Sequence, residues 1–369
     1  MRTVGIEEEL LLVDARTGEP RALASQVLRV AEARGEVTDD LERGSIVHEL
    51  QEEQLETYTP PESDLDCLGQ DLRMWRAAAI ADAAEVGATV IASGTSPLPA
   101  TPRLVRTPRY ERMADRFGLT TSEQLTGGCH VHVSVDSLEE GVGVLDRIRL
   151  WLSVLLALSA NSPYWNGRDT GYDSYRSQAQ ARWPTTGPTE VYGSVAAYRQ
   201  HIDHLLGSGV PLDEGMLYTE ARLSRHYPTV EVRIADVCLE VDDAVLLAAL
   251  ARGLVETAAR EHAAGETPAP VSVSILRLAT WQAGKAGVRG DLLDPSTARP
   301  VPARTRLEAL VAHIADALRD AGDLALVEQG IERVLVHGTG AGRQRAVLGS
   351  SGSLTEVVRD LARRTAGEC

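Results

Sequence analysis

Residues 4–14 of the chain read V-G-I-E-E-E-L-L-L-V-D, and they place three consecutive carboxylates, Glu7, Glu8 and Glu9, inside an otherwise apolar run. In a β-strand, side chains alternate between the two faces, so Glu7 and Glu9 should point one way and Glu8 the other. Like charges on one face repel each other, and a buried carboxylate without a partner is unfavourable. A hard divalent cation such as Mg²⁺ would relieve both problems by binding carboxylate oxygens. The alternative is a solvated strand edge whose charges discourage aggregation.

Length, charge and cysteine spacing limit the classes of protein to which the chain can belong. With 369 residues, it fits one large domain or two smaller ones. Its net charge of −16 argues against nucleic acid or an anionic membrane surface as the main partner. The four cysteines (Cys67, Cys129, Cys238 and Cys369) show no spacing typical of a disulfide scaffold or a zinc site. Since there is no membrane-length apolar run and no signal-peptide pattern, we expect a cytoplasmic protein.

Hydrophobic spacing predicts helices and strands that are interspersed along the chain. Strands are expected at 4–14, 88–93, 129–135, 218–223 and 229–236, and helices at 23–34, 109–116, 145–159, 196–206 and 244–263. A further long helix, with Ser63 as its expected N-cap, has the apolar face Leu65, Leu68, Leu72, Trp75, Ala79 and Ala83. Few segments alternate cleanly as strand, helix and strand, so the pattern favours an α+β fold with an antiparallel sheet.

Two later segments have a distinct character. Residues 163–189 are rich in Gly, Pro, Arg and aromatic side chains and show no clear periodicity. Loops of this length within a compact chain tend to be binding loops or lids, so an active-site loop is expected here. The part from 271 to 369 reads as helices, interrupted at 287–302, 322 and 338–342.

A second group of carboxylates lies at 46–59, where Glu49 and Glu56 are seven residues apart. In an uninterrupted strand an odd separation places two side chains on opposite faces, so a shared site would require a bulge or a break between them. The alternative is a solvated acidic face.

The segment G-G-C-H-V-H-V at 127–133 is expected to be a strand with His130 and His132 on one face and Cys129 on the other. Paired histidines on a strand can bind a metal ion or a phosphate oxygen. Satisfied core histidines are the alternative. The His-Glu-x-x-His signature of zinc hydrolases is absent.

The segment T-V-E-V-R-I-A-D at 229–236 is expected to place Glu231, Arg233 and Ala235 on one strand face. Beside a metal site, the glutamate could bind the ion and the arginine could hold phosphate. An ion pair on a half-exposed strand is the alternative. The chain has no phosphate-binding loop of the Gly-x-x-x-x-Gly-Lys-Ser/Thr kind, so any nucleotide phosphates must be held by metal and arginine.

Read in order, these segments resemble the type 2 glutamate–cysteine ligases, also called carboxylate–amine ligases. The matching motifs are G-I-E-E-E-L at 5–10, Q-L-E-x-x-T-P at 54–60, G-G-C-H-V-H-V at 127–133, S-P-Y-W-N-G-R-D-T-G-Y at 162–172, Y-R-S-Q at 175–178, R-W-P-T at 182–185 and V-E-V-R-I-A-D at 230–236. Each motif alone is weak, but seven in one order over one chain are highly specific. The resemblance extends from about residue 4 to the C-terminus.

The resemblance implies a fold and a reaction. The implied fold is similar to glutamine synthetase and the guanido kinases: a curved antiparallel sheet forms a funnel and helices pack outside it. Residues 1–369 would form a single ligase domain, with the active-site loop at about 163–189 and a C-terminal helical part at about 271–369. The implied reaction is the ATP-dependent joining of a carboxylate, with glutamate favoured, to cysteine or another amine. It would proceed through an acyl phosphate and release ADP and phosphate.

Site residues are implied by the same resemblance, position by position. Two or three Mg²⁺ ions would be bound by Glu7, Glu9, Glu49, Glu56, His130 and Glu231. Contacts with substrates or ATP are expected from His132, Arg168, Tyr172, Arg176, Arg182, Arg233 and Lys285, of which Arg168, Arg176 and Arg233 are also candidate catalytic residues. Lys285, the only lysine, stands where many members have arginine. A lysine offers a point charge and not a bidentate fork, so the contacts of that segment are expected to differ.

Two other functional classes remain open at this point. One is a small-molecule phosphotransferase that stops at phosphoryl transfer, and the other is a nucleotide-binding relative without catalysis. The expected partners are small amino acid and amine substrates, and family likeness suggests a homodimer.

Overall fold

The computed structural model describes residues 1–38 and 43–368, so Cys369 lies outside the described residues. Within that part, one antiparallel sheet contains seven strands: β2, β3, β1, β5, β9 and β8 are neighbours in this order, and β4 pairs with the second half of β1. The strands are β1 (Val4–Asp14), β2 (Ser45–His48), β3 (Gln54–Tyr58), β4 (Ala88–Ile91), β5 (Gly128–Ser134), β8 (Ala221–Leu223) and β9 (Thr229–Asp236). The predicted α+β class with an antiparallel sheet is thus confirmed.

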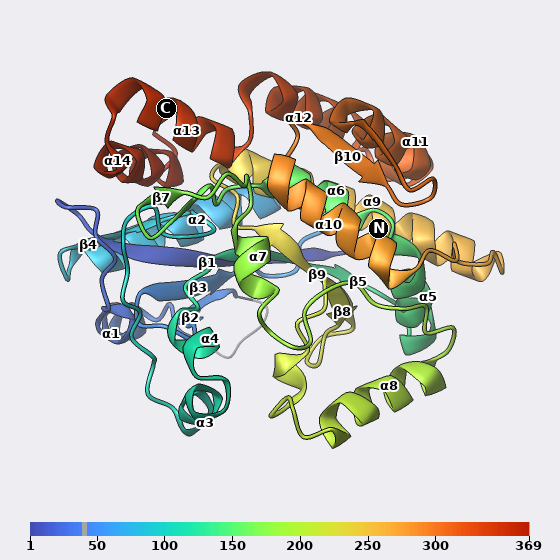
Figure 1. The fold of residues 1–369 in the computed structure, drawn as a ribbon, viewed down its shortest axis with the longest axis horizontal. Coiled ribbons are helices and arrows are strands. Elements are labelled where there is room, and N and C mark those ends of the chain that lie inside the picture. Colours follow the sequence, from blue (N-terminus) through green and yellow to red (C-terminus); the bar gives the residue numbers. More distant parts are fainter. Residues whose placement is uncertain (39–42, 369) are drawn as a thin grey trace.

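Helices lie on both sides of this sheet (Figure 1). In chain order they are α1 (Ala24–Arg34), α2 (Leu65–Ala84), α3 (Pro108–Phe117), α4 (Leu119–Ser122), α5 (Leu138–Ile148), α6 (Leu152–Ser159), α7 (Arg176–Gln180), α8 (Val195–Gly207), α9 (Val241–Ala263), α10 (Val273–Ala286), α11 (Ala303–Ala321), α12 (Leu324–His337), α13 (Gly340–Ser351) and α14 (Leu354–Thr365). A 3₁₀ turn, η1 (Glu214–Met216), precedes β8. The C-terminal helices α11 to α14 lie above the strands in Figure 1, whereas α3, α4 and α8 lie below them.

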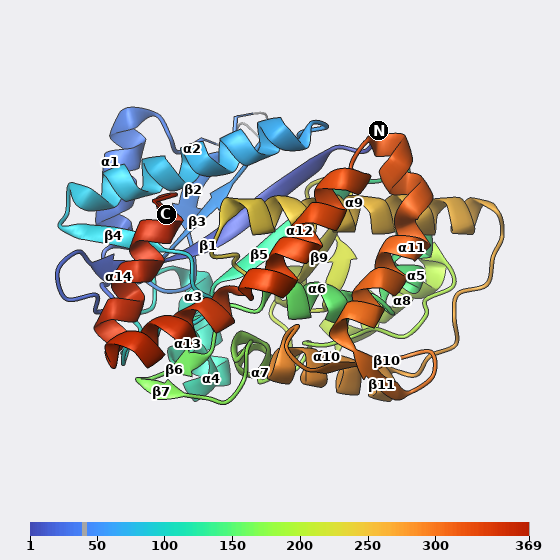
Figure 2. The ribbon, with the colours of Figure 1, turned by 90° about the horizontal axis from the view of Figure 1, so that it is seen from above.

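The main hydrophobic core lies between one face of the sheet and the helices that cover it. Val4 and Ile6 of β1, together with apolar residues of β5 and β9, pack in one cluster with side chains of α2, α5, α6 and α9. Seen from above, α2 and α9 lie beside each other, and α11 and α12 cross in front of α9 (Figure 2). On the opposite face, Leu11 and Val13 at the end of β1 pack with side chains of α14, which leaves the face over the first part of β1 for a polar site.

Helix α2 confirms its predicted apolar face and corrects its predicted start. All six residues of that face are buried. The N-cap, however, is Asp64 and not Ser63: the Asp64 carboxylate accepts hydrogen bonds from the backbone N–H of Asp66 and of Cys67. The backbone carbonyl of Ser63 instead accepts a hydrogen bond from the buried Arg252. The negative charge of the Asp64 carboxylate also interacts favourably with the N-terminus of the helix.

The helix expected over 145–159 is interrupted, so that α5 ends at Ile148 and α6 begins at Leu152. The interruption places Arg149 in the interior, where its guanidinium donates to the carbonyls of Thr189 at 2.6 Å and Val271 at 3.2 Å. The spacing of the apolar residues gave no sign of this turn, and the contacts that Arg149 makes there are with segments distant in sequence.

The loop at 163–189 is more ordered than its sequence suggested and is packed against the C-terminal helices. It contains a short hairpin of β6 (Tyr164–Trp165) and β7 (Arg168–Asp169), followed by α7. Asp173, which is fully buried, accepts hydrogen bonds from Arg289 at 3.0 Å and also from Arg345. A second hairpin, β10 (Asp291–Asp294) and β11 (Arg299–Pro302), fills the predicted break at 287–302.

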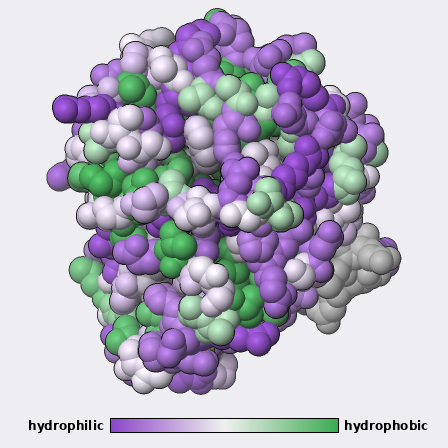
Figure 3. Space-filling view, turned by 90° about the vertical axis from the view of Figure 1, so that its right-hand side faces the viewer, coloured by the Kyte–Doolittle hydropathy of each residue, from purple (hydrophilic) through white to green (hydrophobic). Residues whose placement is uncertain are grey.

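On the side of the molecule that lies to the right in Figure 1, small apolar patches are separated by hydrophilic residues (Figure 3). Among the residues that the structure describes, no helix combines the length and the apolar character needed to cross a membrane.

Candidate active site

The two faces of β1 carry its glutamates in different environments. Glu8 is fully buried on the helix-covered face, where Arg76 of α2 donates to both of its carboxylate oxygens at 2.6 and 2.8 Å. Arg76 is itself buried and also donates to the carbonyls of Cys238 and Leu239. Glu7 and Glu9 point to the other face, into a cavity of about 430 Å³. The predicted alternation along this strand is confirmed.

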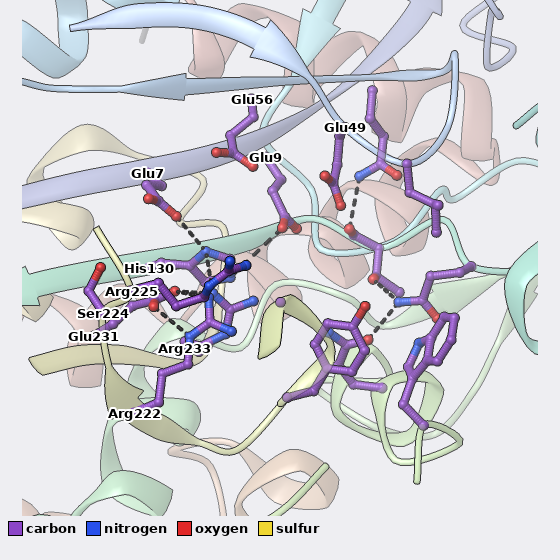
Figure 4. A pocket seen from close by; sticks show the side chains of 18 of the residues that line it. Glu7, Glu9, Glu49, Glu56, His130, Arg222, Ser224, Arg225, Glu231 and Arg233 are labelled. Atoms are coloured by element: carbon purple, nitrogen blue, oxygen red, sulfur yellow. Dashed lines mark hydrogen bonds and ion pairs between the residues drawn. The ribbon is translucent and has the colours of Figure 1, made fainter. Parts of the chain in front are cut away.

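The cavity is lined by side chains from six strands of the sheet, β1, β2, β3, β5, β8 and β9, and from the segments around them (Figure 4). Six of the predicted residues meet in it from four strands: Glu7, Glu9, Glu56, His130, Glu231 and Arg233. His132, from β5, and Glu49, which follows β2, also line it. In Figure 4 the carboxylates of Glu7, Glu9, Glu49 and Glu56 lie along the upper part and the arginines lie below them. Residues from distant parts of the chain thus share one hollow.

Glu7 lies between the two histidines of β5. Its two carboxylate oxygens are 3.0 Å from Nδ1 of His130 and 3.0 Å from Nε2 of His132. Burial alone would raise the pKa of Glu7, but the adjacent His132 and His130 hold that pKa well below its ordinary value. Burial and the nearby Arg233 lower the pKa of His130, whereas Glu7 raises the pKa of His132 in spite of its burial. Glu7 therefore remains a carboxylate, as a metal ligand must.

Glu231 of β9 is bound by two arginines. Arg222 of β8 donates to both Glu231 oxygens at 2.7 and 3.1 Å, and Arg233 donates to one of them. Despite burial, these two guanidinium groups lower the pKa of Glu231 to about 2. Burial opposes the charge of Arg233, yet the carboxylates of Glu231 and Glu7 raise its pKa above the ordinary value. Both groups therefore stay charged at neutral pH.

The remaining three carboxylates are compensated less: Glu9 has Nε2 of His130 at 3.8 Å, and Arg233 only partly offsets the burial of Glu49 and Glu56. Glu9 lies opposite Glu56 in the register of β1 and β3, and its oxygen accepts a hydrogen bond of 2.6 Å from the backbone N–H of Gly128. Burial and the charge of Glu9 raise the pKa of Glu49 to about 8. Burial and three neighbouring glutamates raise the pKa of Glu56 well above its usual range. Carboxylates that repel each other in this way suit a hard divalent cation.

The break that a shared site for Glu49 and Glu56 requires is present. β2 ends at His48 and β3 begins at Gln54, and the intervening turn lets Glu49 enter the cavity beside Glu56 although the two residues are an odd number of positions apart.

Among the described residues, one set of three side chains has possible metal-ligand atoms that all lie within 4.8 Å of one another: Glu7, His132 and Glu231. The predicted ligand set contained His130 and assigned His132 to substrate. The distances place His132 in the tightest cluster.

A β-bulge between β5 and β9 corrects the expected face of Ala235. Cys129 pairs with Ala235 but Val131 pairs with Val232, so that Arg233 and Ile234 together lie opposite one residue of β5. Arg233 still points into the cavity beside Glu231, as expected, but the bulge turns Ala235 with Ile234 into the hydrophobic core. Bulges are common beside active sites because they re-aim a side chain.

Arg176 lies under the cavity and not in it. Its side chain is buried, and its two Nη atoms donate to the carbonyls of Ile234 at 3.2 Å and Arg233 at 3.3 Å, within the bulge. A Cβ atom at Gly128 would lie 2.4 Å from Nη2 of Arg176, so this position accepts only glycine without rearrangement. The predicted contact of Arg176 with substrate stays a prediction, and the structure gives this residue a contact with the strand that carries Arg233.

Four other predicted contact residues do not line the cavity. Arg168 is exposed on β7, and Arg182 pairs with Glu123 at 2.7 Å. Lys285 lies over the ring of Tyr172, with Nζ 4.6 Å from the ring centroid. Their substrate contacts, like every other predicted role at this site, stay predictions.

Several cavity residues were not predicted from the sequence. Arg109 and Tyr110 come from α3, Tyr218 and Arg222 from the segment through β8, and Arg225 from the turn between β8 and β9. A signal existed for Arg222, because a hairpin with its turn at 224–228 pairs this residue with Glu231. No comparable signal existed for Arg109, whose place depends on the packing of α3.

Sequence comparison gives relatives along the whole chain. Residues 3–361 match the family model described as "Glutamate-cysteine ligase family 2". A protein of Streptomyces coelicolor provisionally named glutamate–cysteine ligase 2 is 52% identical over 365 residues, which cover 99% of both chains. One of Streptomyces avermitilis, provisionally named glutamate–cysteine ligase 2-1, is 51% identical over 367 residues and 100% of both chains.

Solved structures share the fold at low sequence identity. A glutamate–cysteine ligase of Francisella tularensis, crystallised in complex with AMP, has a TM-score of 0.70 at 16% identity and covers 99% of this chain and 88% of its own. A bifunctional glutathione synthetase of Pasteurella multocida has a TM-score of 0.67 at 16% identity, with 99% of this chain and 52% of that chain covered. The predicted fold type, with its funnel-like antiparallel sheet, agrees with these neighbours.

Proposed function

The chain belongs to glutamate–cysteine ligase family 2, and on that premise we propose that it is an ATP- and Mg²⁺-dependent ligase. It joins a carboxylic acid, with glutamate favoured, to cysteine or another amine through an acyl phosphate. ATP as co-substrate is supported by the AMP complex of the Francisella tularensis protein, which has the same fold. Residues 1–369 act as one catalytic domain in this proposal, because the loop at 163–189 is held by residues of the C-terminal helices, such as Arg345.

The observation that carries the proposal is the excess of carboxylate charge in one cavity. Glu7, Glu9, Glu49, Glu56 and Glu231 line it together. Neighbouring histidines or arginines bring the net pKa of Glu7 and Glu231 below the ordinary value, whereas Arg233 does not offset the burial and repulsion at Glu49 and Glu56. The upward pKa shifts of Glu49 and Glu56 indicate that further positive charge is needed there. The carboxylates are ligands that fit Mg²⁺, which would supply charge neutralisation for phosphoryl transfer when bound.

The chain's own residues would perform the remaining tasks. Phosphoryl transfer mainly requires alignment of the reacting oxygens and stabilisation of charge on the moving group. Arg233 has that position: its guanidinium lies on the same strand face as Glu231, points into the cavity and is held by Glu231. Arg109 and Arg225 lie at the same cavity and could hold a carboxylate or phosphate. No nucleophilic side chain is needed, because the acid itself attacks the terminal phosphate.

A hydroxamate assay tests this proposal. The chain is incubated with ATP, Mg²⁺, hydroxylamine and each of a panel of amino acids and other carboxylic acids, and both ADP and hydroxamate are measured. An acyl phosphate reacts with hydroxylamine, so at least one acid, with glutamate first in the panel, should yield equal amounts of the two products. ADP without hydroxamate from any acid would favour a phosphotransferase. Neither product with any acid would overturn the proposed ligase.

A further inference from the structure

A second hollow lies next to the active-site cavity and has a different chemical character. It has a volume of about 270 Å³ and lies between α8 and the segment that leads into β8, the edge strand of the sheet. Its wall combines apolar and aromatic side chains (Tyr192, Tyr198, Ile202, Leu205, Leu217 and Leu223) with polar and charged ones at its rim and toward the active site (Arg199, His201, Asp203, Glu214, Thr219, Arg222 and Arg225). Its volume is near the lower end of the roughly 300–1,000 Å³ typical of small-ligand pockets.

Helix α8 places an apolar stripe over this hollow without filling it. Val195, Tyr198, Ile202 and Leu205 follow helical spacing along one side, yet α8 has no buried residue. Val195 and Tyr198 pack against the main core, whereas Ile202 and Leu205 line the hollow further along the helix. The helix stands at the lower edge of the molecule in Figure 1. An amphipathic helix normally buries such a stripe, so the arrangement leaves room for an apolar group.

Two arginines line both the hollow and the active-site cavity. Arg222 is fully used, because it donates to both oxygens of Glu231 and to the carbonyl of Leu217. Arg225 is held more loosely: its side chain is 43% exposed, and its ion pair with Glu214 is 3.6 Å long. A guanidinium in this position suits a carboxylate that lies between the polar cavity and the apolar hollow.

We propose that the hollow under α8 binds the side chain of the amine substrate, and that this substrate is an amino acid with an apolar or aromatic side chain. The inference rests on the proposed ligase function. The amino group then faces the active-site cavity, Arg225 binds the α-carboxylate, and Ile202 and Leu205 contact the side chain. The acid is assigned to the other side of Arg222, because its reacting carboxylate must lie beside the carboxylate cluster that would bind metal.

A comparison of amine substrates that have and lack a side chain provides the test. With the best acid from the hydroxamate panel, product formation is measured for glycine, L-cysteine, L-leucine and L-phenylalanine. We expect kcat/KM for leucine or phenylalanine to exceed that for glycine by roughly tenfold to a hundredfold, the gain typical of burying such a side chain. Leu205→Trp and Ile202→Trp should remove most of this preference, through KM for the amine. Hydroxylamine has no side chain, so hydroxamate formation and KM for the acid should change less than about twofold.

The control is His204→Trp, which adds the same bulk at an exposed position of α8 that does not line the hollow, and it should keep the wild-type preference. Arg225→Ala should raise KM for phenylalanine but not for phenethylamine, which lacks the carboxylate. Equal preference for glycine and phenylalanine, or a changed KM for the acid in Leu205→Trp, would overturn the inference.

If no acid yields hydroxamate, the proposed function fails and binding alone decides the inference. Calorimetric titration of L-phenylalanine and glycine into wild type and Leu205→Trp then provides the readout. Binding of phenylalanine that is lost in the variant would support the hollow as a side-chain site, and no difference between wild type and variant would reject it.

Discussion

The two faces of β1 place the same residue type in buried positions and treat its charge in opposite ways. On the helix-covered face, Glu8 and Arg76 form a buried bidentate pair, so the charge is balanced within the chain. On the cavity face, Glu9 lies opposite Glu56, and Glu49 is close enough for Glu9 to raise its pKa. A folded chain rarely keeps such repulsion without a use. The difference indicates that Glu8 serves stability, whereas the cavity glutamates serve a ligand of positive charge.

The largest expected effect follows from changing the cavity face. Glu9→Gln and Glu231→Gln each remove one negative charge from the candidate metal site while keeping the shape of the side chain. We expect either substitution to lower kcat by at least roughly a hundredfold to a thousandfold, because charge stabilisation in the transition state depends on this cluster. Steady-state ADP release measures the effect, and circular dichroism checks the fold. Wild-type rates in either variant would contradict the assignment of this face.

The second effect concerns the helix-covered face and is one of stability. Glu8→Gln leaves the guanidinium of Arg76 buried without its anion, so the free energy of unfolding should fall by about 3–5 kcal/mol. Urea denaturation of the protein without divalent ions measures this change. An unchanged midpoint and slope of the urea transition would show that the Glu8–Arg76 ion pair does not stabilise the fold.

Glu56→Gln is the matched control for Glu8→Gln, because it makes the same change on the opposite face. Burial and the glutamates around it raise the pKa of Glu56, so its charge is unfavourable without a cation. The substitution should therefore increase the stability of the metal-free protein, by the order of 1 kcal/mol. It should also reduce the stabilisation that added Mg²⁺ gives to wild type. Destabilisation by both substitutions would remove the distinction between the faces.

Sequence reasoning succeeded where the strand period alone decides the outcome. The alternation along β1 predicted the separation of Glu8 from Glu7 and Glu9, and the same rule predicted the common face of His130 and His132. The family motifs then predicted that segments far apart in sequence contribute to one site. Periodicity within a segment cannot predict this. The antiparallel α+β fold followed from the lack of regular strand–helix alternation.

The parts that could not be predicted depend on contacts between distant segments. The bulge that turns Ala235 into the core arises from the register of β9 on β5, and nothing in the local sequence marks it. Arg76 lies beside the apolar face of α2, and its partner Glu8 is 68 residues away. Arg109 enters the cavity from α3, where it pairs with Asp213 at 2.7 Å. Each of these residues takes its role from tertiary packing.

Glu220 provides a third, intermediate case and a test of pH dependence. It is 7% exposed, and its oxygen accepts one hydrogen bond, of 2.7 Å, from the hydroxyl of Thr280. Burial raises its pKa from 4.5 to about 7, against the opposing effects of Thr280 and Arg277. Because the folded-state pKa is the higher one, the associated stability is fully present below about pH 4.5 and is lost as the pH rises to about 7.

Glu220→Gln should abolish this loss. Between pH 4.5 and 8, the unfolding free energy of the variant should fall by about 3 kcal/mol less than that of wild type. Thermal unfolding at a series of pH values measures the difference. The exposed Glu190, changed to Gln in the same way, serves as the control and should leave the pH profile unaltered. If the stability of wild type and of Glu220→Gln changed with pH in the same way, the charge of Glu220 would be compensated within the chain, as that of Glu8 is, and unlike the charges of Glu49 and Glu56.

The smallest effect on activity is expected at Cys129, which adjoins the candidate metal site in sequence but lies on the other side of the sheet. Its side chain is fully buried in the main core, next to Cys238, while His130 points into the cavity. Cys129→Ser should lower stability by about 1–3 kcal/mol, since it buries a hydroxyl in an apolar cluster. It should change kcat and KM by less than about twofold. Cys129→Ala, which has no hydroxyl to bury, separates packing from chemistry. If both variants stay folded and both lose activity, the helix-covered face takes part in catalysis and the contrast between the two faces fails.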